Sequence, residues 1–142
     1  MTSGMVIMSM REVNMISLES LQKSGKARAP IMLLYGPGGI GKTTLATSFP
    51  APVVIDIEDG LGEIKVDSFG PDVITSFEDV RAALIALSTE QHNFETLVID
   101  SLDWLEPMVW AHACKENGWS DIEKPGFGKG YIAALAHWRE YL

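Results

Sequence analysis

The sequence reads Ile31-Met-Leu-Leu-Tyr-Gly-Pro-Gly-Gly-Ile-Gly-Lys-Thr-Thr44 where an apolar run meets a glycine-rich loop. Gly36, Gly41, Lys42 and Thr43 occupy every fixed place of the pattern G-x-x-x-x-G-K-[ST], which is the phosphate-binding loop. The apolar run 31–35 predicts a fully buried strand in front of the loop. Thr43 and the residues after it predict a helix behind the loop. Strand, loop and helix together are the setting that this motif requires.

Each residue type in the loop has a physical task. Glycines let successive backbone N–H groups turn inward around phosphate oxygens, and the new helix points its positive end at the same phosphates. Lys42 adds a cation that reaches the phosphates, and the Thr43 hydroxyl is a ligand for Mg²⁺. The loop predicts binding of a nucleoside triphosphate with Mg²⁺, held by Gly36, Pro37, Gly38, Gly39, Ile40, Gly41, Lys42, Thr43 and Thr44.

Length and composition set limits on the rest. The chain has 142 residues, 46% hydrophobic and 21% charged, which is ordinary for one soluble domain. No apolar run reaches membrane-spanning length, so no membrane association is expected. Cys114 is the single cysteine and suits a reducing cytoplasm. The net charge of −8 does not attract the whole chain to nucleic acid, so any DNA contact needs a local basic patch.

Along the chain, apolar strands alternate with amphipathic helices, which predicts an α/β fold with a mostly parallel sheet flanked by helices. We divide it into an N-terminal extension, 1–29, and a nucleotide-binding domain, 30–142. After the loop we expect strands at 53–57, 73–74 and 94–100. Helices are expected from the N-cap Ser76, from a first turn containing Pro107 to a cap at Gly118, and from Tyr131 with residues 132, 135 and 138 buried.

Carboxylates end two of these strands. Asp100 closes the apolar strand Leu97-Val-Ile99, where an aspartate that orients Mg²⁺ belongs. Asp56 and Glu58 lie on one face at the end of the strand 53–57. Glu58 is the better candidate for the base that activates water because it lies nearer the crevice, whereas Asp56 holds the strand end. A solvated acidic loop, and an aspartate that only caps a turn, are the structural alternatives.

In order and spacing these segments resemble the RecA-like ATPases, over roughly residues 16–142. The resemblance rests on the loop at 36–45, on Ile55-Asp-Ile-Glu-Asp-Gly-Leu61, and on Leu97-Val-Ile-Asp-Ser-Leu-Asp-Trp-Leu-Glu-Pro107. It is strongest for the phage and prophage branch, small ATP-binding proteins linked to recombination and single-strand annealing. The resemblance implies hydrolysis of ATP to ADP and phosphate, with Lys42 and Glu58 catalytic and Thr43 and Asp100 at the Mg²⁺ ion. It also implies a cis Asp100–Ser101 peptide bond.

The resemblance further implies partners: single-stranded DNA, a single-strand-binding protein, and other copies of the chain in a homo-oligomer. The DNA-contacting loop would fall at 119–131, where Lys124 and Lys129 could bind backbone phosphates and the aromatic residues could stack on bases. Asp121 and Glu123, however, cancel the charges of the two lysines. A purely structural glycine loop is an equal alternative there. His112 and Cys114 point in different directions on one helix, and because no further ligands accompany them we assign them to packing rather than to a metal.

In the RecA-like sheet a further strand, carrying a sensor for the γ-phosphate, lies between the phosphate-loop strand and the Asp100 strand. No segment before Leu142 supplies it, so we expect a domain truncated at its C-terminus, an ATPase when full-length and inactive or slow as this fragment. Two other functions stay open. One is a non-enzymatic nucleotide-binding or interaction module. The other is a small-molecule kinase, which the lack of an arginine-rich lid disfavours.

Overall fold

The computed structural model describes Leu18 and residues 29–141. The chain divides into two units, Met1–Met32 and Leu33–Leu142, and every helix and strand reported below belongs to the second. The expected N-terminal extension, 1–29, lies almost wholly outside the described residues. Within the described residues, no helix is both long enough and apolar enough to cross a bilayer.

The second unit is built on a parallel three-stranded sheet. Its strands are β1 (Pro52–Asp56), β2 (Asp67–Phe69) and β3 (Thr96–Asp100), in the order β2-β1-β3. The central strand β1 has four consecutive buried residues, as expected for a strand covered on both faces. Its register with β3 pairs Ile55 with Ile99 and Asp56 with Asp100. Two carboxylates therefore end neighbouring strands at the same edge of the sheet.

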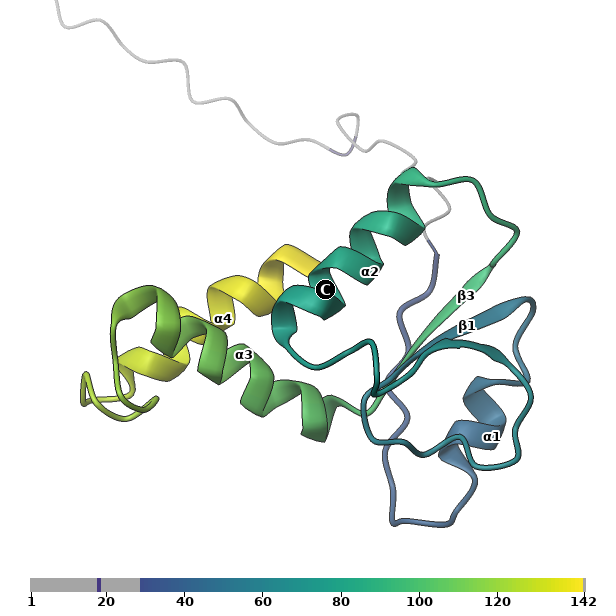
Figure 1. Ribbon diagram of the computed structural model, residues 1–142, viewed down its shortest axis with the longest axis horizontal. Helices are drawn as coiled ribbons and strands as arrows, with labels where there is room; N and C mark the ends of the chain where they lie inside the picture. Colours follow the sequence, from purple (N-terminus) through teal and green to yellow (C-terminus); the bar gives the residue numbers. More distant parts are fainter. Residues whose placement is uncertain (1–17, 19–28, 142) are drawn as a thin grey trace, which may run out of the picture. The chain divides into compact units, whose positions relative to one another are not determined.

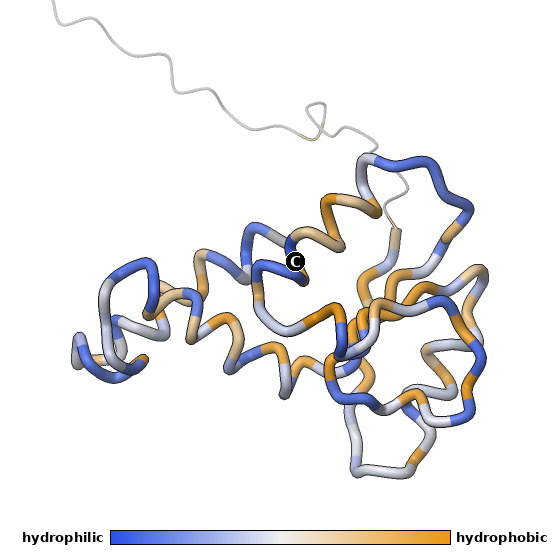
Figure 2. The backbone as a smooth tube through the Cα atoms, viewed as in Figure 1, coloured by the Kyte–Doolittle hydropathy of each residue, from blue (hydrophilic) through white to orange (hydrophobic). Residues whose placement is uncertain are grey.

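Four helices accompany the sheet: α1 (Lys42–Ala46), α2 (Phe77–Thr89), α3 (Leu102–Asn117) and α4 (Lys129–Tyr141). Figure 1 shows α2, α3 and α4 grouped together, with α1 apart from them beside the strands. The buried core joins this group to the sheet, and its members include Ile55 of β1, Val80 of α2, Val109 of α3 and Ala134 of α4. Figure 2 shows hydrophobic residues along the strands and a polar loop between α2 and β3.

The helix ends follow local chemistry. The Ser76 hydroxyl accepts a hydrogen bond from the backbone N–H of Asp79, which confirms Ser76 as the N-cap of α2. The hydroxyls of Ser76 and Thr75 donate to the Asp79 carboxylate and lower its pKa. Gly118 ends α3 with a φ of 67°, the left-handed cap that the sequence predicts. Pro107, by contrast, lies inside α3 rather than in its first turn, because the helix begins at Leu102.

Three sequence predictions about the core were wrong. None of residues 31–35 is in a strand, and Leu33 and Tyr35 are 68% and 89% exposed. An apolar run becomes a buried strand only where a neighbour satisfies its backbone groups, and no described strand pairs with this run. The expected strand at 73–74 is replaced by β2 at 67–69, which pairs with β1. In α4, Ile132 and Leu135 are exposed, whereas Ala134 is buried and Trp138 packs partly buried against the core, as predicted for Trp138 alone.

Candidate nucleotide site

The phosphate-binding loop runs from Gly36 to the start of α1. Gly41 precedes the helix with a φ of 95°, a backbone conformation that disfavours any residue with a side chain. This turn lets α1 begin directly behind the loop, so its unpaired N–H groups face the loop. The Lys42 ammonium donates hydrogen bonds to the carbonyl oxygens of Gly36 (2.8 Å) and Pro37 (3.1 Å). The lysine side chain thus folds back over its own loop.

Thr43, at the end of the loop, and Asp100, at the end of β3, link the loop to the sheet. The Thr43 hydroxyl donates a hydrogen bond of 2.6 Å to Oδ2 of Asp100, although 57 positions separate them in sequence. A hydroxyl and a carboxylate in contact are the oxygen ligands that Mg²⁺ prefers. These two residues therefore fit a magnesium ion, and the structure brings together the pair that the sequence proposed for it.

Asp100 also fixes the strand end next to it. Its backbone carbonyl accepts hydrogen bonds from the N–H groups of Ile57 (2.8 Å) and Glu58 (3.3 Å). The peptide bond between Asp100 and Ser101 is cis, which confirms the prediction made from the resemblance. This peptide leads directly into α3, whose N-cap is Ser101. The carboxyl ends of β1 and β3 are thereby held against each other beside the loop.

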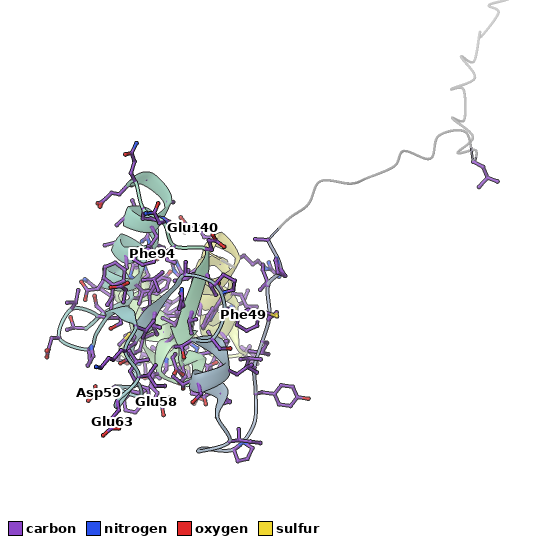
Figure 3. All side chains as sticks on the ribbon, turned by 90° about the vertical axis from the view of Figure 1, so that its right-hand side faces the viewer. Phe49, Glu58, Asp59, Glu63, Phe94 and Glu140 are labelled. Atoms are coloured by element: carbon purple, nitrogen blue, oxygen red, sulfur yellow. The ribbon has the colours of Figure 1, made fainter. Side chains whose placement is uncertain are left out.

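Of the three acidic residues at the end of β1 and directly after it, one is buried and two are exposed to solvent. Asp56 is buried at 3% exposure, and its Oδ1 accepts a hydrogen bond of 3.1 Å from the N–H of Gly60. It closes the turn after β1, in line with the structural task predicted for it. Glu58 and Asp59 are exposed, at the same end of the molecule as Glu63 in Figure 3. Glu58 is thus anchored through its backbone while its side chain is open to solvent.

Gly60, at the same edge of the sheet, was not identified as a site residue from the sequence. A Cβ atom built on Gly60 would lie 3.8 Å from Oδ2 of Asp100, so the backbone at Gly60 passes close to the Thr43–Asp100 pair. Its N–H is also the donor that Asp56 binds. The signal was present in the sequence as a glycine directly after Glu58 and Asp59, which is a turn composition. Sequence alone did not indicate that this turn folds back over Asp100.

A family model described as an AAA domain matches residues 28–142. The chain belongs to this family. The match spans the loop, the three strands and the four helices, and it places the AAA domain of this chain among the P-loop ATPases, with the α/β architecture seen in the sheet and its helices. Comparison of the chain with curated proteins and with solved structures gave no match.

Proposed function

We propose that this AAA domain binds Mg·ATP at the loop 36–44 and hydrolyses it to ADP and phosphate. The observation that carries the proposal is the 2.6 Å contact between Thr43 and Asp100, since it unites the loop and a strand-end carboxylate in one oxygen donor set. In the proposed assignment, the backbone N–H groups of the loop and Lys42 hold the phosphates, while Thr43 and Asp100 hold the ion. A bound Mg²⁺ would supply neutralisation of the phosphate charge.

Glu58 is the proposed base of this reaction. Its side chain is exposed beyond the end of β1, and its backbone N–H binds the carbonyl of Asp100, the residue proposed to hold the ion. A carboxylate there would orient the attacking water and accept its proton. Asp56 is unsuited to this role because it is buried and occupied by Gly60. Glu58 and Lys42 are therefore the residues to which we assign catalysis.

Replacing Lys42 with alanine is expected to weaken Mg·ATP binding about 10- to 100-fold, since a hydrogen bond from a charged group contributes about 1.5–3 kcal/mol. Titration calorimetry with Mg·ATP measures this loss. Lys65→Ala is the matched control, because it removes an exposed lysine that lies outside the loop. If the unchanged chain shows no affinity for Mg·ATP, or if Lys42→Ala binds it equally well, the nucleotide-site assignment is wrong.

We further propose that the domain is of the RecA-like kind and serves DNA recombination or single-strand annealing. In this arrangement the segment 119–131, which runs from the end of α3 into the first residues of α4, contacts single-stranded DNA. Phe127 supports the proposal because it is 99% exposed, and a fully exposed aromatic ring is available to stack on a base. Gly130 fixes the end of this segment: a Cβ there would lie 1.8 Å from the carbonyl oxygen of Ile122, so only glycine allows the close approach.

Single-stranded DNA is accordingly expected to bind the chain and to change its rate of ATP turnover. Phe127→Ala should weaken DNA binding about 5- to 100-fold, since stacking of one base on an aromatic residue contributes about 1–3 kcal/mol. Fluorescence anisotropy with a labelled oligonucleotide measures it. Tyr35→Ala is the matched control, because Tyr35 is another largely exposed aromatic residue but lies outside the segment. DNA binding that Phe127→Ala leaves unchanged would remove the segment from the interface, and no DNA effect at all would count against the recombination role.

A further inference from the structure

The structure gathers two histidines and a glutamate where the sequence offered only an isolated histidine. His112 and Glu116 lie one turn apart on α3, and His137 reaches them from α4. One ligand atom from each of the three residues lies within 4.8 Å of the others. Because His137 follows His112 by 25 positions and belongs to another helix, sequence spacing could not reveal this cluster. The expectation that His112 has no further ligands was therefore wrong.

We propose that His112, Glu116 and His137 form a binding site for Zn²⁺ or a similar divalent transition metal that joins α3 to α4. Two imidazoles and a carboxylate are a ligand set that zinc favours. Tetrahedral coordination at about 2.0–2.1 Å places ligand atoms roughly 3.3 Å apart. Nε2 of His112 lies 3.3 Å from Oε1 of Glu116, and Nε2 of His137 lies 3.0 Å from Oε2 of Glu116. A small movement of the two histidine side chains toward each other would bring all three ligand atoms to tetrahedral spacing.

The state of His112 points independently to a ligand. Its side chain is 7% exposed, and within the described chain its two ring nitrogens are the buried side-chain atoms without a properly directed hydrogen bond. Each nitrogen nevertheless lies within 3.3 Å of a carboxylate oxygen. A buried imidazole is energetically unfavourable when neither of its ring nitrogens makes a well-directed hydrogen bond. A metal ion bonded to Nε2 would satisfy one of them.

The other nitrogen of His112 has the partner that metal-bound histidines usually have. Nδ1 lies 3.2 Å from Oε1 of Glu78, on α2. A carboxylate in this position fixes the tautomer and raises the basicity of the nitrogen that binds the metal. The Lys115 ammonium donates a hydrogen bond of 3.1 Å to the same oxygen, so a second partner also holds the Glu78 carboxylate in place.

Aromatic packing holds the two imidazole rings in place. They meet edge to face with their centroids 4.7 Å apart, and Phe77 packs against the His112 ring at 5.2 Å and the His137 ring at 6.0 Å.

The proposed metal site is separate from the proposed nucleotide site. His112 lies ten residues along α3 from Leu102, which is about 15 Å of helix. The metal would therefore fasten α3 to α4 and take no part in phosphate chemistry.

The test is titration calorimetry of tag-free, chelator-treated protein with ZnCl₂, without nucleotide. We expect one equivalent to bind and to raise the unfolding temperature. Glu78→Gln should weaken binding about 10- to 100-fold, and His137→Gln and Glu116→Gln should weaken it more. His92→Gln, which removes an exposed histidine outside the cluster, and Cys114→Ser should bind zinc as the unchanged chain does. Absence of zinc binding, or binding that survives both His137→Gln and Glu116→Gln, would overturn the proposal.

Cobalt provides a readout that does not depend on the folding of any variant. Co²⁺ added to the unchanged chain should give the intense visible absorption of a four-coordinate ion, without the thiolate charge-transfer band that Cys114 would produce. Displacement by one equivalent of Zn²⁺ should abolish the absorption. A weak spectrum typical of six-coordinate, water-bound Co²⁺, or a thiolate band, would overturn the assignment of the ligands.

Discussion

A Glu58→Gln protein is expected to bind Mg·ATP as tightly as the unchanged chain but to hydrolyse it about 10²–10⁴-fold more slowly, the range for loss of a general base. The exchange keeps the size of the side chain and removes its ability to accept a proton. The backbone at this position is held by the N–H of Glu58 on the Asp100 carbonyl, so the glutamine should leave the strand end unchanged. Phosphate release in single-turnover conditions measures the rate.

Glu63→Gln is the matched control for this experiment, since Glu63 is another exposed glutamate at the same end of the molecule (Figure 3). Its hydrolysis rate should equal that of the unchanged chain. Calorimetry with Mg·ATP on both variants separates binding from chemistry. Measurable turnover that is equal in Glu58→Gln and the unchanged chain would exclude Glu58 as the base. A parallel loss of Mg·ATP binding would instead mean that Glu58 helps to hold the nucleotide.

The largest expected effect on stability comes from Ile55→Ala. Ile55 is fully buried in the central strand β1, beside Ile99 of β3, and belongs to the core shared with three helices. Shortening it to alanine removes buried carbon atoms and leaves a cavity, which costs about 2–5 kcal/mol of unfolding free energy. Because domains of ordinary stability unfold with only about 5–15 kcal/mol, such a loss removes a large fraction of the total.

Urea unfolding followed by circular dichroism measures the change against Ile85→Ala. Ile85 lies on α2 with 53% of its surface exposed, so the same substitution there should change the free energy by no more than about 0.5 kcal/mol. A similar loss in both variants would mean that β1 is not the centre of the core. A small effect of Ile55→Ala alone would mean that the core readily closes around the missing atoms.

Local chemistry made several parts of this molecule readable from the sequence. The cap at Ser76 and the glycine that ends α3 depend on contacts within a few residues, and both were predicted. The strand that closes at Asp100 was also predicted, from its run of apolar residues, although it forms by pairing with the distant strand β1. The α/β architecture was predicted because buried strands and amphipathic helices have different periods. The loop 36–44 was recognisable because its glycines, lysine and threonine are needed at fixed spacing.

Apolar composition was a weaker guide than local spacing. Residues 31–35 look like a core strand, yet Leu33, Leu34 and Tyr35 are exposed, because burial depends on which strands pair and not on hydrophobicity alone. Conversely, β2 has the mostly polar sequence Asp-Ser-Phe and still joins the sheet by pairing with β1. In α4, Ala134 is buried and Ile132 is exposed, because the orientation of the packed helix decides which of its faces meets the core.

The sequence by itself determined that this chain carries a phosphate-binding loop followed by strands that end in carboxylates, because fixed spacing in a short segment encodes that chemistry. Only the tertiary structure placed Thr43 against Asp100 and folded Gly60 over that pair. It alone brought His137 to His112 and Glu116. These contacts join residues tens of positions apart, and their distances follow from the parallel register of the strands and the packing of helices, which no local pattern specifies.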